Sequence, residues 1–168
     1  MSYGEHQRAA ADDAARCAVI TLSDTRTTDT DKSGKKLCEL LSAGGHAVAF
    51  YRIIPDEPAT LDALLEQLLE RDDIDAIITN GGTGISRRDH TIEVIQKRLD
   101  QTLPGFGELF RMLSWEQIGS GAMLSRAVGG VAQGTLVFAL PGSTAAVELG
   151  MTRLIVPELR HLVRELRK

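Results

Sequence analysis

Cysteine and histidine are scarce in this sequence, and neither residue type is clustered. The chain has two cysteines, Cys17 and Cys38, and its four histidines are scattered. It contains no Cys-x-x-Cys, and neither cysteine lies beside a histidine at the spacing of metal ligands. These absences argue against a disulfide framework and against a zinc site. We expect two buried free thiols, which suit a reducing cytoplasm.

Basic residues are also in short supply, and no apolar run is long. The chain has 19 Lys and Arg against 23 Asp and Glu, a formal net charge of −4. Binding to nucleic acid or to an anionic membrane usually needs a basic face, so neither partner is expected, although Arg87-Arg88 forms a local basic spot. No apolar run approaches a membrane span, and the N-terminus lacks the pattern of a signal peptide. We therefore expect a cytoplasmic protein.

What the sequence does contain is an alternation of short apolar runs with amphipathic stretches. Its 168 residues, 43% hydrophobic and 25% charged, suit one globular domain. Strands are predicted at 17–22, 46–54, 74–79 and 135–140, while 125–131 reads as a short strand or a turn. Helices are predicted after Ser33-Gly34, from caps at Thr60 and Thr91, around 106–113, and from Thr144 with a restart at Pro157. This order predicts an α/β fold with a mostly parallel sheet covered on both faces.

The domain boundary is predicted near the first strand. Residues 1–16 are rich in alanine and lack a sustained apolar face, so we expect a mobile N-terminal tail followed by a single domain over 17–168. In the helix around 106–113, Phe106, Leu109, Phe110 and Leu113 recur at helical spacing and are predicted to face the core.

The most informative stretch joins the third strand to the helix that follows it. Gly81-Gly82-Thr83-Gly84 places three glycines in four positions, and Arg87, Arg88 and Asp89 come next. Glycines let backbone N–H groups approach a phosphate, and a helix N-terminus adds positive potential. The spacing matches neither Gly-x-Gly-x-x-Gly nor a P-loop. On spacing alone, a tight turn without a ligand is an equally good interpretation.

Polar side chains follow several of the predicted strands. Right-handed crossovers should bring Ser23-Asp24, Asp56, the glycine loop with Asp89, and Pro141-Gly142-Ser143 to one edge of the sheet. Singly, such aspartates are typical turn formers or caps. As a group beside a phosphate-binding loop they indicate Mg²⁺, which prefers one or two carboxylates plus substrate phosphate oxygens.

Other residues of these loops could contact a phosphorylated ligand. Arg87 or Arg88 could neutralise phosphoryl charge, and Ser23, Thr83 and Ser143 could donate hydrogen bonds, although Ser143 could equally cap its helix. No spacing favours a covalent nucleophile. The residues therefore support metal-assisted chemistry on a phosphorylated or nucleotide ligand, without naming it.

A more specific signal is Gly-Gly-Thr-Gly followed by Arg-Arg-Asp-x-Thr at 81–91, which resembles the signature of the molybdenum cofactor biosynthesis MoaB/MogA family. The similarity covers about residues 17–166. Its further matches, in order, are Ser23-Asp24, 55–57, 104–108 with Arg111 and Ser114, Ser125-Arg126, and 140–143. The stretch from Ser114 through 125–127 to Leu-Pro-Gly-Ser-Thr is more similar to MoaB than to MogA.

This resemblance implies a three-layer α/β/α fold that forms a homotrimer or homohexamer and binds molybdopterin. In MogA-like members it implies Mg²⁺-dependent transfer of AMP from ATP to the molybdopterin phosphate, with release of pyrophosphate. Asp56 and Asp89 match the acidic residues tied to that activity and are predicted to be catalytic and to bind the metal. The predicted substrate-binding residues are Ser23, Asp24, Gly81, Gly82, Thr83, Gly84, Arg88, Ser114, Pro141, Gly142 and Ser143.

Two other interpretations stay open at this point. The chain could be a non-catalytic molybdopterin-binding or carrier protein, or a structural scaffold, since gephyrin-like proteins use this domain for assembly. The two carboxylates favour the enzyme, because a pure pterin binder has little need of a Mg²⁺ site. The sequence does not distinguish a trimer from a hexamer, or a molybdenum from a tungsten pathway.

Overall fold

The chain is represented by a computed structural model that describes residue 4 and residues 14–168. Most of the predicted tail, 1–16, lies outside the described residues. Ala15 is fully buried, and the first strand, β1 (Arg16–Leu22), begins one residue before the predicted strand 17–22.

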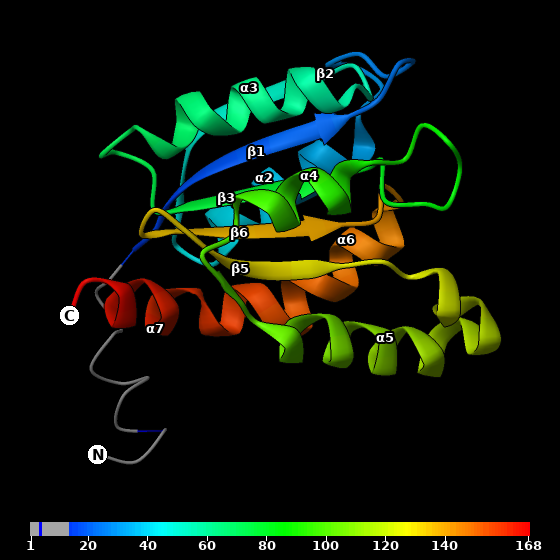
Figure 1. Cartoon of the computed structure of the whole chain (residues 1–168). Helices are drawn as coiled ribbons and strands as arrows, with labels where there is room; N and C mark the ends of the chain where they lie inside the picture. Colours follow the sequence, from blue (N-terminus) through cyan, green and yellow to red (C-terminus); the bar gives the residue numbers. More distant parts are fainter. Residues whose placement is uncertain (1–3, 5–13) are drawn as a thin grey trace.

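The described residues form a six-stranded sheet in the order β2-β1-β3-β6-β5-β4. The strands β2 (Ala47–Ile54), β1, β3 (Ala76–Asn80) and β6 (Thr135–Leu140) are parallel to their neighbours, which confirms the α/β fold with a mostly parallel sheet. Every residue of β3 and β6 is buried, because helices cover both faces of the central strands. Their carboxyl ends point to the same edge (Figure 1).

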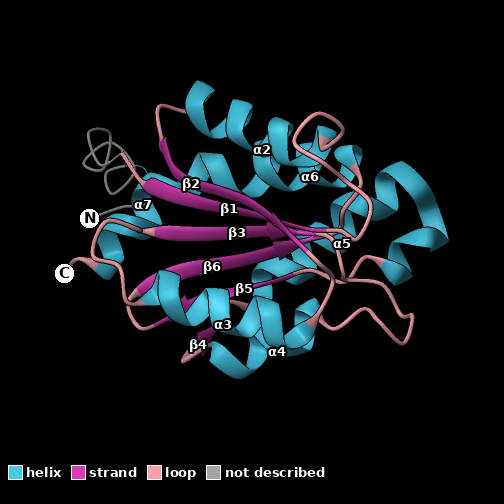
Figure 2. Ribbon diagram, turned by 90° about the horizontal axis from the view of Figure 1, so that it is seen from above, coloured by secondary structure: helices cyan, strands magenta, loops and turns pink. Residues whose placement is uncertain are grey.

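Helices pack on both faces of this sheet (Figure 2). The helices α3 (Pro58–Leu69) and α4 (Thr91–Arg98) share one core with Ile77 of β3. The other core joins Ile78 to α2 (Lys32–Ala43), α5 (Pro104–Ile118), α6 (Thr144–Gly150) and α7 (Val156–Leu166). Successive side chains of a strand point to opposite faces, so one apolar strand supplies both cores.

The antiparallel edge of the sheet decides between the two alternatives predicted for 125–131. Residues 128–132 form a strand, β5 (Val128–Ala132), and Gly129-Gly130, expected to form a bend, lies inside it. A methyl group on Gly129 would meet the ring of Phe138, so these glycines serve close packing. The short strand β4 (Gln101–Thr102) and the 3₁₀ turn Gly119–Leu124 were not predicted.

Both predicted threonine caps are wrong. Helix α3 begins at Pro58, whose fixed φ suits the first helical position, and its N-cap is Glu57. Helix α4 begins at Thr91, and its N-cap is His90. The predicted restart at Pro157 corresponds to a π-helical turn, Met151–Ile155, that joins α6 to α7 without a gap. A proline lacks the N–H that a regular helix would use there.

The predicted core stripe of α5 is confirmed in three of its four members. Phe106, Phe110 and Leu113 are buried, but Leu109 is 46% exposed. None of the helices in the described part of the chain is long and apolar enough to cross a membrane.

Candidate functional site

The glycine loop is held in a conformation that only glycine adopts easily. Gly81 and Gly82 have φ values of 99° and 63°. A methyl group on Gly81 would collide with the carbonyl oxygen of Leu22 at the end of β1, and the Gly81 N–H donates to the carbonyl of Leu140, 3.1 Å away, at the end of β6. The loop is therefore wedged between the ends of two strands.

The loop 141–143 is fixed against the glycine loop by residues from the segment after β1. Arg26 Nη2 and Ser33 Oγ both donate to the carbonyl of Gly142, at 2.9 and 2.7 Å. The Gly142 Cα faces Gly81 so closely that a methyl group there would lie 3.1 Å from the Gly81 Cα. Ser143 caps α6, because its Oγ accepts the N–H of Ala146 at 3.1 Å.

Buried Asp31 anchors the residues that hold this second loop. Its side chain accepts hydrogen bonds from the Gly34 N–H, 2.9 Å away, and from the Tyr51 hydroxyl, 2.7 Å away. Arg26 forms an ion pair with the same carboxylate at 3.4 Å. Neither Arg26 nor Asp31 was predicted from the sequence, although the Asp-x-x-Gly spacing ahead of α2 is a signal for a helix cap.

The three predicted aspartates do lie together at this edge. Asp24 Oδ1 accepts the backbone N–H of Asp56 at 3.1 Å, and Asp24 also pairs with Arg88 at 2.8 Å. A methyl group on Gly82 would lie 2.6 Å from Asp56 Oδ1, and one on Gly84 would lie 2.8 Å from Asp89 Oδ2. Both carboxylates are thus packed directly against the glycine loop.

The electrostatics of Asp56 reflect this crowding. Burial, followed by repulsion from Asp89 and Asp24, raises the pKa of the Asp56 carboxyl, and Arg88 offsets part of the effect. Asp89 is held by the Ser86 N–H, which donates to its Oδ2 at 3.0 Å. A site that gathers carboxylates without enough local positive charge suits a bound cation.

The carboxylate oxygens of this site suit Mg²⁺ whose remaining ligands would come from the substrate. Within residues 14–168, no group of three or more His, Cys, Asp and Glu side chains is arranged to hold a metal ion. Mg²⁺ is commonly bound by one or two carboxylates with phosphate oxygens and water filling the other positions. In addition, the buried hydroxyl of Thr91 has no hydrogen-bond partner beside this loop. Asp56 and Asp89 are the residues that would hold such a cation, with phosphate oxygens of a substrate completing its ligands.

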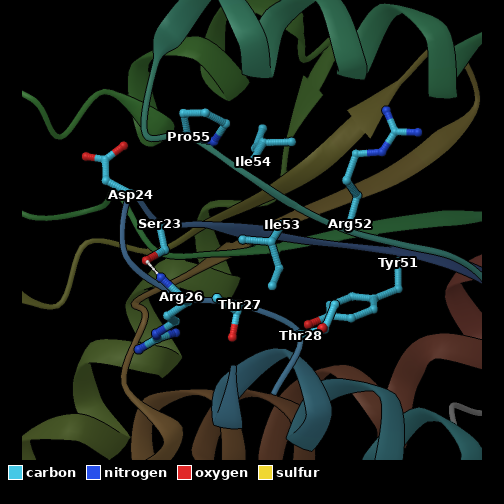
Figure 3. A pocket seen from close by; sticks show the side chains of 10 residues that line it. All are labelled: Ser23, Asp24, Arg26, Thr27, Thr28, Tyr51, Arg52, Ile53, Ile54 and Pro55. Atoms are coloured by element: carbon cyan, nitrogen blue, oxygen red, sulfur yellow. Dashed lines mark hydrogen bonds between the residues drawn. The ribbon is translucent and has the colours of Figure 1, made fainter. Parts of the chain in front are cut away.

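A cavity of about 540 Å³ opens beside Asp24 and Pro55. Figure 3 shows its walls, which come from the segment after β1 and from β2. Its polar lining includes Arg26, Arg52 and Tyr51. Ser23 Oγ, also in the lining, accepts a hydrogen bond from the backbone N–H of Arg26 at 3.1 Å. Its size is sufficient for part of a nucleotide or a pterin.

A second cavity, of about 240 Å³, lies on the α5 side of the loop 141–143. Ser114, Ser125, Pro141 and Ser143 line it. Ser114 is buried, and its hydroxyl donates to the Phe110 carbonyl at 2.7 Å. Asp24, Asp56 and Asp89 do not line this cavity. Of the predicted substrate-binding residues, Ser23 and Asp24 line the first cavity. The second is lined by Ser114, Pro141 and Ser143. The glycine loop 81–84, Arg88 and Gly142 line neither cavity.

Comparison with known proteins identifies the family. The family described as probable molybdopterin binding domain matches residues 18–161. The chain belongs to the MoaB/MogA molybdopterin-binding family. It is 52% identical to the molybdenum cofactor biosynthesis protein B of Halalkalibacterium halodurans over 169 residues, covering 100% of this chain and 99% of that protein.

Solved MoaB structures have the same fold. A crystal structure of a molybdenum cofactor biosynthesis protein B superposes with a TM-score of 0.89 at 50% identity, covering 92% of this chain and 96% of that chain. A structure described as the molybdopterin biosynthesis enzyme MoaB from Thermus thermophilus superposes with a TM-score of 0.80 at 34% identity, covering 90% and 96% of the two chains. The resemblance seen in the sequence, including its MoaB character, is confirmed.

Proposed function

We propose that this MoaB/MogA-family chain is a molybdopterin adenylyltransferase. It would transfer AMP from ATP to the molybdopterin phosphate. An oxygen of that phosphate forms a bond to the α-phosphorus of ATP, the bond from this phosphorus to the bridging oxygen breaks, and pyrophosphate leaves. The nucleophile belongs to the substrate, which agrees with the lack of a nucleophile-and-base pair in the sequence.

The observation that carries this proposal is the packing of Asp56 and Asp89 against one glycine loop. A protein that only binds a pterin has no need to place carboxylates so close together. Here their repulsion adds to burial in raising the pKa of the Asp56 carboxyl. Bound Mg²⁺ would neutralise charge on the phosphate oxygens of ATP. Asp56 and Asp89 would hold it, and the backbone of 81–84 would orient the phosphates.

The two cavities support a site for two substrates. One lies beside Asp24 with Arg26 and Arg52, and the other lies beside Ser114 and Ser143. They flank loops that are in direct contact, since Gly142 packs on Gly81. Holding two reactants across such a junction is the main catalytic contribution that the chain's own residues would make.

The decisive experiment incubates the purified protein with molybdopterin, ATP and Mg²⁺ and measures adenylylated molybdopterin and pyrophosphate. Asp89→Asn should lower the rate at least about 100-fold with the fold intact. Asp62→Asn is the matched control, because Asp62 pairs with Arg98 on the α3–α4 surface and should leave the rate unchanged. Full activity in folded Asp89→Asn would overturn the metal-site assignment, and tight pterin binding without product would identify a carrier.

We further propose that the chain self-associates as a homotrimer or homohexamer. Large apolar side chains stay exposed along α5 and the 3₁₀ turn that follows it: Leu109, Met112, Trp115, Ile118, Met123 and Leu124. Exposed apolar side chains concentrated in one region commonly mark a protein interface. Association through this face would bury them next to the cavity at Ser114.

A further inference from the structure

Thr91 carries a buried hydroxyl that no other group in the described structure satisfies. The residue is 1% exposed, and its Oγ1 has no hydrogen-bond partner. It does not cap α4, because His90 occupies the N-cap position. A buried hydroxyl without a partner costs on the order of 1–3 kcal/mol, and a ligand that satisfied the hydroxyl would offset that cost.

The hydroxyl of Thr91 and the carboxylate of Asp56 converge on one point. A methyl group built on Gly82 would collide with Thr91 Oγ1 and would lie 2.6 Å from Asp56 Oδ1. The Thr91 N–H donates to the carbonyl of Gly82 at 3.0 Å, which ties the start of α4 to the loop. The two oxygens therefore face the same side of Gly82 without a hydrogen bond between them.

The chemistry of this pair selects the kind of ligand. A phosphate oxygen at this point would be repelled by the Asp56 carboxylate. A divalent cation would be attracted to the carboxylate and would accept a lone pair from the hydroxyl. Serine and threonine hydroxyls serve Mg²⁺ in this way in P-loops, where the cation also contacts nucleotide phosphates.

We propose that Thr91 Oγ1 is a neutral oxygen ligand of the divalent cation held by Asp56 and Asp89, and that Gly82 lacks a side chain to leave room for it. The inference rests on the proposed function, because the cation is the one that would bind ATP. It adds a third protein oxygen to a site in which the sequence indicated two carboxylates.

The test uses Mn²⁺ as a paramagnetic probe and, because ATP itself binds Mn²⁺, measures protein-bound Mn²⁺–ATP by the enhancement of water-proton relaxation. Thr91→Val removes the hydroxyl with little change of shape and should weaken Mn²⁺ binding about tenfold. Thr91→Ser should bind Mn²⁺ like the wild type. The metal-free Thr91→Val protein should unfold at the same temperature as the wild type or a higher one, because it loses an unsatisfied buried polar atom.

Thr79→Val is the matched control. The Thr79 hydroxyl is also buried without a partner, but Thr79 lies within β3, paired with Ile20 and Ala139. Its loss should leave Mn²⁺ binding unchanged. If Thr91→Val binds Mn²⁺ normally, or if it weakens ATP binding equally in EDTA, the inference is overturned while the proposed function stands. A wild-type protein that binds no Mn²⁺ with ATP overturns both.

Discussion

Arg126 holds the glycine loop from a position 42 residues further along the chain. Its Nη1 donates a hydrogen bond to the carbonyl oxygen of Gly84, 2.8 Å away, and its Nη2 pairs with Glu93 of α4. The loop that packs against Asp56 and Asp89 is thus tied to the segment just before β5. A hydrogen bond from a charged donor to a loop carbonyl restricts the loop in the geometry that the ligand needs.

Arg126→Ala should therefore loosen the loop without unfolding the protein. We expect the affinity for ATP with Mg²⁺ to fall about tenfold by calorimetry, and the amides of 82–90 to exchange hydrogen faster. Arg98→Ala removes a similarly buried arginine of α4, which pairs with Asp62 of α3, and should leave ATP binding unchanged. Equal ATP affinity in both variants would contradict the tethering role.

Asp56→Asn should stabilise the metal-free protein. Folding raises the pKa of this carboxyl, so its ionised form is destabilising. The cost is absent below the unfolded pKa of about 3.9 and is fully present above the raised pKa of the folded state. In EDTA at pH 7 we expect Tm to rise by about 2 °C, with no gain below pH 4. A variant that is less stable at pH 7 would show that Asp56 has a structural role.

Asp75 should stabilise the protein at neutral pH and lose this effect in acid, which is the opposite of the effect of Asp56. Burial alone would raise the pKa of Asp75, but hydrogen bonds from Arg16 and Arg167 outweigh it and lower the pKa to about 2. The resulting stability is present above the unfolded pKa of about 3.9 and is lost as pH falls through the folded value.

Asp75→Asn should accordingly lower the free energy of unfolding at pH 7 by about 1–2 kcal/mol, allowing for the half-exposed arginines. Urea titrations between pH 7 and pH 2 should show the difference shrink below pH 4. Asp73→Asn, which breaks an exposed pair with Arg71, provides the control and should change neither value measurably. A constant difference at all pH values would rule out the ionic explanation.

Gly81→Ala should destabilise the fold as well as the site. The residue has a φ of 99°, and a methyl group would strike the Leu22 carbonyl, which is backbone and cannot rotate away. We expect a loss of about 2–4 kcal/mol in unfolding free energy by urea denaturation. Gly105→Ala, where a methyl group would meet nothing within 4 Å in α5, should change stability by less than about 1 kcal/mol. Similar losses at both positions would contradict this account.

Trp115→Lys should dissociate the proposed oligomer. Trp115 is 62% exposed on α5 among the other apolar side chains of that face. Light scattering should report a mass that falls toward the 18.2 kDa of one chain, while Trp115→Phe keeps the larger mass. A wild-type protein with the mass of a single chain would rule out the oligomer. An unchanged mass in the lysine variant would show that the interface lies elsewhere.

The sequence by itself determined the central sheet and the loops at its carboxyl edge. Apolar runs such as 135–140 and glycines such as Gly81 act through local backbone preferences, so their structure can be predicted from the sequence. The family signature at 81–91 likewise lies within one short segment. Strand-end positions were enough to place Asp24, Asp56 and Asp89 together, because parallel strands bring their ends to one edge.

Tertiary structure alone decided the contacts between distant segments. Arg26 reaches Gly142 across 116 residues and Arg126 reaches Gly84 across 42, and no local pattern encodes such pairs. Thr91 matched a capping pattern, but it is the first residue of α4, and its N–H donates to the carbonyl of Gly82. The antiparallel β5 depended on the ring of Phe138 filling the space that Gly129 leaves open. Local preference selects the elements, whereas the packing of side chains between them places the functional atoms.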